Sequence, residues 1–170
     1  MYTVSMNIHP IFVHFPIALL TIYALFEIFA WKKLRALSWW VYVKATLLFV
    51  GIISSFAALN TGETAEHLIG RSALIEMHST FATGTVWLFG ILALVYLIRF
   101  VLESSYIINF PKLQNFLTAV QNYIDRFSFL IPSFAFVGLV LVTVTGALGG
   151  AIVYGPEVDP IVSFVYHFFF

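Results

Sequence analysis

Four stretches of this sequence are each long and apolar enough to cross a lipid bilayer, and this feature limits the possible folds most. A spanning helix needs about 20 mostly apolar residues, and the four stretches cover approximately residues 8–31, 39–59, 75–97 and 129–154. Lipid admits only helices and closed barrels, and barrel strands would alternate over about ten residues. The uninterrupted runs therefore predict a single all-α domain, residues 1–170, folded as an integral membrane four-helix bundle.

The composition supports this class and excludes several others. Hydrophobic residues make up 61% of the chain and charged residues 9%, whereas a soluble domain has about 25% charged residues. Eight Lys and Arg balance eight Asp and Glu, so the chain has no cationic surplus for nucleic acid. The absence of cysteine excludes disulfides, covalently attached c-type haem, Cys-ligated iron–sulfur clusters and thiol catalysis. No phosphate-binding glycine loop or hydrolase motif occurs.

The positions of the cations predict the orientation of the bundle. One cation, Arg71, lies in the second connection, and the other seven lie in or beside the first and third connections. The seven are Lys32, Lys33, Arg35, Lys44, Arg99, Lys112 and Arg126. By the positive-inside rule, both termini then lie on the outer, extracytoplasmic side. The first span lacks the cationic start and cleavage site of a signal peptide, so we expect it to be retained, in a bacterial inner (cytoplasmic) membrane.

Two connections are expected to contain further helices. Residues 111–127 repeat apolar side chains at three- and four-residue steps behind Pro111, which predicts an amphipathic helix between the third and fourth spans. We expect this helix to lie in the inner membrane–water interface or to bind a partner. In the second connection, Thr61 is a candidate N-cap for a short outer helix that returns the chain to the third span.

One carboxylate falls inside the first span. Glu27 stands near the inner end of this apolar run, where an unpaired charge is costly. We expect it to pair with Lys44, or with Lys32 and Arg35 if these reach back into the membrane. The alternative is a role in handling protons.

All five histidines fall on the predicted outer side of the molecule. His9 and His14 lie at the outer end of the first span, His78 at that of the third, His67 in the second connection and His167 in the tail. Ionisable residues inside spans mark pathways or cofactors, and imidazole is a common ligand for haem iron, zinc and copper. The histidines are therefore candidate ligands, although each could instead be a structural residue that hydrogen-bonds a helix end.

The spacing of these histidines limits which of them can act together. His9 and His14 are separated by about 140° around a helix that turns about 100° per residue, so one centre rarely uses both. A pair across the bundle, His14 with His78, is the favoured set of axial ligands for haem b. His9 with His67 could form a second, more superficial pair.

A porphyrin also needs space and a cation for its propionates. Arg71 is the outer cation that could meet propionates, or it could pair with Glu66 or Glu76. Small residues in the second, third and fourth spans could provide the space, or could serve helix packing alone. These residues are Gly51, Ala57, Ala58, Gly62, Ala82, Gly84, Gly146, Gly149 and Gly150.

The opening sequence, His9-Pro-Ile-Phe-Val-His14-Phe-Pro16, resembles the signature of a family of four-helix membrane proteins, the domain-of-unknown-function 2231 family. Three further features match in order: Thr61-Gly62-Glu63-Thr-Ala65-Glu66, His78 and Gly149-Gly150-Ala-Ile-Val153-Tyr154. The resemblance covers nearly the whole chain, with His9, His14 and His78 at matched positions and His67 a weaker match. His167 and the Phe tail fall outside the pattern. Members occur beside, or fused to, redox domains such as cytochromes c, so the resemblance implies a haem-linked role.

These observations predict a small b-type-cytochrome-like membrane subunit, with His14 and His78 as favoured haem ligands. It would bind one haem b, or two, near the outer face. It would transfer electrons between quinone or other membrane partners and an outer-side carrier such as a cytochrome c. We expect an electron-transfer or accessory subunit and not a stand-alone enzyme. The alternatives are a non-catalytic scaffold subunit of a larger membrane complex and a copper- or zinc-handling membrane protein.

Overall fold

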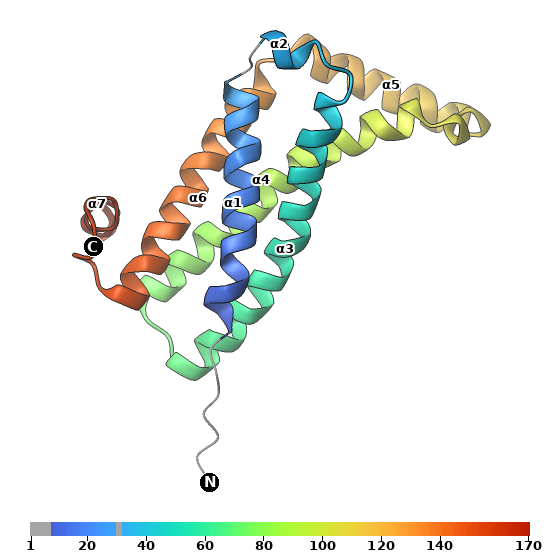
Figure 1. Cartoon of the computed structure of the whole chain (residues 1–170). Coiled ribbons are helices and arrows are strands. Elements are labelled where there is room, and N and C mark those ends of the chain that lie inside the picture. Colours follow the sequence, from blue (N-terminus) through green and yellow to red (C-terminus); the bar gives the residue numbers. More distant parts are fainter. Residues whose placement is uncertain (1–7, 30–31) are drawn as a thin grey trace.

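Long helices that run alongside one another form the body of the protein, and a helical arm projects sideways from one end (Figure 1). The computed structural model describes residues 8–29 and 32–170, apart from the side chains of Lys32 and Arg35. The described elements are α1 (His9–Ile28), α2 (Lys32–Arg35), α3 (Trp40–Ile69), α4 (Ala73–Glu103), the 3-10 helix η1 (Ser105–Asn109), α5 (Pro111–Arg126), α6 (Leu130–Tyr154) and α7 (Pro160–Phe169).

The predicted all-α four-helix membrane bundle is confirmed. Helices α1, α3, α4 and α6 are each long and apolar enough to cross a membrane. Around the bundle, α1 packs between α3 and α6, and α4 packs between the same two helices, so α1 and α4 lie diagonally opposite. We call the end with the α3–α4 turn the histidine end, and the end with α2 and α5 the cationic end.

The second span is longer than the sequence suggested, and the expected short outer helix does not form. Helix α3 continues through Thr61 to Ile69, because the Thr61 hydroxyl donates to the carbonyls of Ala57 and Ala58 within the same helix. The helix ends where Gly70 adopts φ +94°, a conformation that glycine tolerates best. Ser72, and not Thr61, is the N-cap that starts the next helix, accepting from the backbone N–H of Ile75 at 3.3 Å.

Two other boundaries differ from expectation. Helix α4 extends from Ala73 to Glu103, beyond the predicted 75–97. The tail forms α7, which the sequence analysis did not foresee, although Asp159 before Pro160 is an N-cap followed by proline at the first helical position. The predicted end of the first span, residues 30–31, lies outside the described residues, whereas the predicted amphipathic helix forms as α5.

The core lies in the middle of the bundle, where two glycines bring the helices close together. Leu20, on α1, fits against Gly51, where an added Cβ would lie 2.6 Å from the leucine side chain. Phe89, on α4, similarly lies over Gly138, with 2.7 Å to an added Cβ. Small residues serve this purpose in membrane bundles, since dispersion contacts replace the hydrophobic effect. The core clamps the four helices and thereby fixes which of their faces point inward.

Candidate functional site

Two histidines from diagonally opposite helices meet at the histidine end. His9 begins α1, and His78 lies in the second turn of α4. Their ring centroids are 6.5 Å apart, and the ring planes cross at 86°. Both side chains are half-buried. The structure therefore brings together His9 and His78, a pair that the sequence analysis did not propose.

Each imidazole is oriented by a hydrogen bond at Nδ1. The Nδ1–H of His78 donates to the carbonyl oxygen of Thr145, on α6, at 3.0 Å. The Nδ1 of His9 lies 3.1 Å from the Thr61 hydroxyl, on α3. Since that hydroxyl donates to carbonyls of its own helix, it is available to accept the Nδ1–H of His9. In a neutral ring this tautomer leaves the lone pair on Nε2, the arrangement that orients metal-binding histidines.

Two glycines accommodate the imidazole rings. A Cβ added to Gly62 would lie 3.1 Å from Cε1 of His9, and one added to Gly149 would lie 3.2 Å from Cε1 of His78. Each ring therefore packs directly against the backbone of the neighbouring helix. By contrast, an added Cβ at Gly146, one turn from Gly149, would meet nothing within 4 Å. Gly62, on α3, and Gly149, on α6, thus contribute to the histidine site. All four spanning helices therefore take part in it.

A second polar layer lies at the cationic end of the same bundle interior. Lys44, on α3, donates to both carboxylate oxygens of Glu27, at 2.9 and 3.0 Å, which confirms the predicted pair. The Tyr96 hydroxyl, on α4, also donates to Glu27, and the Lys44 ammonium lies 5.7 Å from the Tyr96 ring centroid. Glu27 is only 4% exposed. Its charge is therefore matched by groups from two other helices, as burial in a membrane requires.

The spacing along the chain relates the two layers. Eighteen residues separate His9 from Glu27 (27 − 9), and the same number separates His78 from Tyr96 (96 − 78). At about 100° per residue this is about five complete turns, so both members of each pair share one helix face about 27 Å apart. His14 lies about 220° from Glu27 around the helix. Glu27 was thus the signal that could have selected His9 over His14, because an intramembrane carboxylate must face the interior.

The other predicted site residues lie apart from this pair. His14 is exposed on α1, and its Nδ1–H donates to the carbonyl of Pro10. His67 is exposed in the last turn of α3. Arg71 pairs with Glu66 at 2.9 Å, which is one of the two alternatives that the sequence left open. Its role toward propionates remains a prediction.

His167 belongs to a separate, exposed interaction that holds α7. Its Nε2 lies 2.7 Å from a carboxylate oxygen of Glu157, and the Ser163 hydroxyl donates to the other oxygen at 2.9 Å. These hydrogen bonds lower the pKa of Glu157. The pair joins the connection between α6 and α7, where Glu157 lies, to the last turn of α7.

The number of ligands restricts the chemistry available at the histidine end. Within residues 8–29 and 32–170, no three His, Cys, Asp or Glu side chains come together in a way that could hold a metal ion. What the described chain provides is a pair of imidazoles. Two protein ligands suit a centre that brings its remaining ligands with it, as haem does, or an ion of low coordination number.

The fold and this site define a class: a small four-helix membrane protein with a histidine pair at one end of its interior and a buried ion pair at the other. The chain matches the domain-of-unknown-function 2231 (DUF2231) family, described as predicted membrane proteins, over residues 5–159. It therefore belongs to that family. Neither a curated protein nor a solved structure matches it.

Proposed function

We propose that this protein is a small b-type-cytochrome-like membrane subunit that binds haem b through His9 and His78 and transfers electrons. The observation that carries this proposal is the meeting of the two imidazoles from diagonal helices. Haem b supplies an iron that changes by one electron. The chain supplies the ligands, their orientation and a largely apolar surrounding, which together tune the potential.

The two rings are close enough that His9 and His78 would hold one metal with little movement. With metal–nitrogen bonds of about 2.0 Å, two imidazoles that share one metal would have ring centroids no more than about 6.3 Å apart. The separation in the protein is 6.5 Å. Nδ1 of each ring is already engaged by Thr61 or Thr145, so neither ring needs to turn over to present Nε2.

Space at the site sets a condition on haem binding. Gly62 and Gly149 already touch the two imidazoles, so a porphyrin between the rings would have to move α3 and α6 apart at the histidine end. This end is formed by helix termini and the 70–72 turn, outside the Leu20–Phe89 cluster that fills the centre of the bundle. We therefore place the adjustment there and not in the Leu20–Phe89 core.

The positive-inside rule supports an orientation for electron transfer. If the cationic end faces the cytoplasm, the histidine pair lies near the outer face of a bacterial inner membrane. Electrons would then pass between quinone or other membrane partners and an outer-side carrier such as a cytochrome c. The histidine pair would lie at this outer face, about 27 Å from the Glu27–Lys44 layer. Electrons would then be exchanged with the carrier on the histidine side.

The test is spectroscopic and uses the whole purified protein. Oxidised and dithionite-reduced absorption spectra and the pyridine-haemochrome assay are recorded for the native chain and for His9→Ala, His78→Ala and His14→Ala. We expect a Soret band in the native protein and in His14→Ala, and loss of haem in the other two variants. A native protein without a Soret band and without haemochrome would overturn the proposal.

A bare copper or zinc ion is the second candidate, and the tight packing of the rings favours it. An ion would need no movement of α3 or α6, since it requires only the two imidazole nitrogens. Two imidazoles alone suit Cu(I), which binds few ligands, better than zinc, which takes four. Elemental analysis of the haem-free protein distinguishes this case, because it predicts stoichiometric metal that both His9→Ala and His78→Ala remove.

A further role as an accessory subunit is supported by His14. An ionisable side chain within a span that faces away from its own bundle is costly in lipid, and His14 is exposed on α1 between the exposed side chains Phe12 and Phe15. A neighbouring subunit would cover it. This role predicts that His14→Leu weakens assembly of the native complex while leaving the absorption spectrum unchanged.

A further inference from the structure

The arm at the cationic end presents an apolar surface that the bundle itself does not cover. It consists of the last turns of α4, η1 and α5, and it projects sideways from the bundle (Figure 1). Helix α5 has no buried residue. Phe116, on the apolar side of α5, is 63% exposed, and Phe110, which precedes α5, is 61% exposed. Apolar rings of this size are stabilised by burial away from water, so a covering phase is expected.

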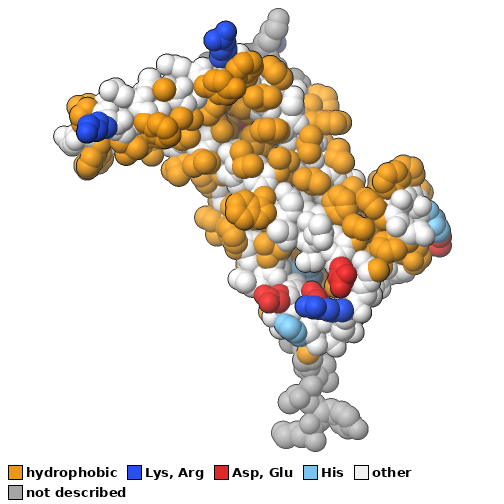
Figure 2. All heavy atoms as spheres, turned by 180° about the vertical axis from the view of Figure 1, so that it is seen from behind, with side chains coloured by type: hydrophobic (Ala, Val, Ile, Leu, Met, Phe, Trp, Pro, Cys, Tyr) orange, Lys and Arg blue, Asp and Glu red, His pale blue; other side chains and the backbone are white. Residues whose placement is uncertain are grey.

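The surface of the arm continues into the surface that faces lipid. Figure 2 shows patches of hydrophobic side chains along the arm and on the adjoining flank of the bundle, with polar side chains and backbone between them. That flank belongs to helices that are long and apolar enough to cross a membrane. The same phase that surrounds the bundle therefore reaches the arm, and this continuity selects lipid as the occupant over a second protein.

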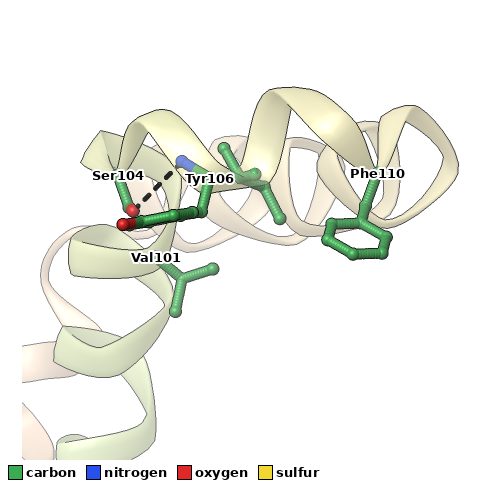
Figure 3. Close-up of a pocket in the computed structure, with 5 residues that line it drawn as sticks. Val101, Ser104, Tyr106 and Phe110 are labelled. Carbon is green, nitrogen blue, oxygen red and sulfur yellow. Dashed lines mark hydrogen bonds between the residues drawn. The ribbon is translucent and has the colours of Figure 1, made fainter.

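The tip of the arm contains a hollow suited to a chain of methylene groups. Its volume is about 260 Å³, and it is lined by Val101, Ser104, Tyr106, Ile107 and Phe110. Figure 3 shows that it is open and that its one marked hydrogen bond, from the Tyr106 backbone N–H to the Ser104 hydroxyl, stays within the chain. The side chains of Val101, Ile107 and Phe110 give the hollow a mostly apolar lining.

The charges on the arm indicate which lipid headgroup fits. Lys112 lies two residues after Phe110, which lines the hollow. Arg126 is the last residue of α5, and both cationic side chains are exposed. The acidic residue of α5, Asp125, is already paired with Arg99 at 2.8 Å. Glu103, at the end of α4, is the opposing charge near the tip. Cations beside an apolar membrane surface attract anionic headgroups, each strengthening binding by about fivefold.

We propose that this arm is a binding site for an anionic phospholipid, with an acyl chain in the tip hollow and the phosphate near Lys112. The arm lies along the membrane interface with Phe110 and Phe116 in the acyl region. It anchors the cationic end of the bundle and sets its depth. This inference is independent of what the histidine pair binds.

The depth of the arm is tested with nitroxide labels, which the absence of cysteine makes straightforward. Single-cysteine variants Phe116→Cys and Asn122→Cys place labels about 120° apart around α5, one on its apolar side and one on its polar side, in the full chain in phosphatidylglycerol-containing vesicles. We expect the label at 116 to collide more with oxygen than with a water-soluble nickel complex, and the label at 122 to show the reverse. Equal exposure to the nickel complex, or dipolar coupling between labels of two copies, would overturn the proposal.

Headgroup preference is tested by native mass spectrometry of the protein released from mixed phosphatidylglycerol and phosphatidylcholine. We expect Lys112→Gln to reduce the preference for retained phosphatidylglycerol about fivefold and Glu103→Gln to increase it. Arg71→Gln, at the histidine end, is the matched control and should change nothing. No preference in the native chain, or an equal loss with Arg71→Gln, would overturn the anionic-lipid site.

Discussion

Removal of one partner from the Glu27–Lys44 pair should destabilise the bundle far more than removal of both. Glu27→Leu leaves the Lys44 ammonium, whose side chain is 15% exposed, without its carboxylate. Lys44→Met leaves a carboxylate that is 6% exposed, with Tyr96 as its remaining donor. Breaking a buried pair in this way costs about 3–5 kcal/mol, whereas replacing both partners by apolar residues is often neutral.

The two single variants should also differ from each other. The long Lys44 side chain can reach toward the interface when its partner is lost, but Glu27, whose acceptor atoms are fixed between α3 and α4, has no such route. We therefore expect Lys44→Met to cost more than Glu27→Leu. The double variant should recover most of the loss.

The assay is reversible denaturation by SDS in mixed micelles, followed by circular dichroism, for the native chain, both single variants and the double variant. Asp125→Asn provides the control, because the Arg99–Asp125 pair is 37% and 51% exposed and such pairs contribute about 0–1 kcal/mol. If the losses of the two single variants simply add in the double variant, Glu27 and Lys44 are not coupled and the reasoning fails.

Three further outcomes are expected. Gly146→Ala, which meets open space, should gain stability through its higher helix propensity, whereas Gly149→Ala, whose Cβ would crowd His78 at 3.2 Å, should be less stable than Gly146→Ala; equal melting temperatures of the two variants would contradict this. If the histidine pair binds the proposed haem or metal, Thr61→Val should lower its affinity, measured by competition with a chelator or apo-globin, without loss of helix content. Hydrogen bonds lower the pKa of Glu157, so its contribution is present above the ordinary glutamate pKa and is lost as pH falls through the lowered value. A label at Phe168→Cys should therefore become mobile in acid, and Glu157→Gln should make it mobile already at neutral pH.

The sequence predicted most of the fold because the membrane restricts the choices. Runs of about 20 apolar residues have few alternatives to a spanning helix, and the buried carboxylate of Glu27 needed a cation within reach, which Lys44 provided. The boundary of α3 was harder to predict. Threonine can cap a helix or return its hydroxyl to a carbonyl within one, and Thr61 does the latter while also meeting His9.

The histidine pair shows what spacing alone leaves open. Spacing established that His9 and His14 point in different directions, but not which of them faces the interior, because rotation about the helix axis is set by packing. Leu20 and Tyr23 fix that rotation, Leu20 by packing on Gly51 of α3 and Tyr23 by packing on Phe89 and Tyr96 of α4. The separation of His9 and Glu27 by about five helical turns carries the same information in the sequence. It identifies the inward-facing histidine once the Glu27–Lys44 pair is known to lie in the interior of the bundle.

The most direct test of the histidine pair as a haem site is electron paramagnetic resonance of the oxidised protein. If His9 and His78 kept their 86° interplanar angle on one low-spin ferric haem, they would give a highly anisotropic low-spin signal. We predict that signal in the native protein and in His14→Ala, and its loss in His9→Ala and His78→Ala. A high-spin or rhombic signal in the native protein, or a signal that depends on His14 and not on His9, would contradict the account.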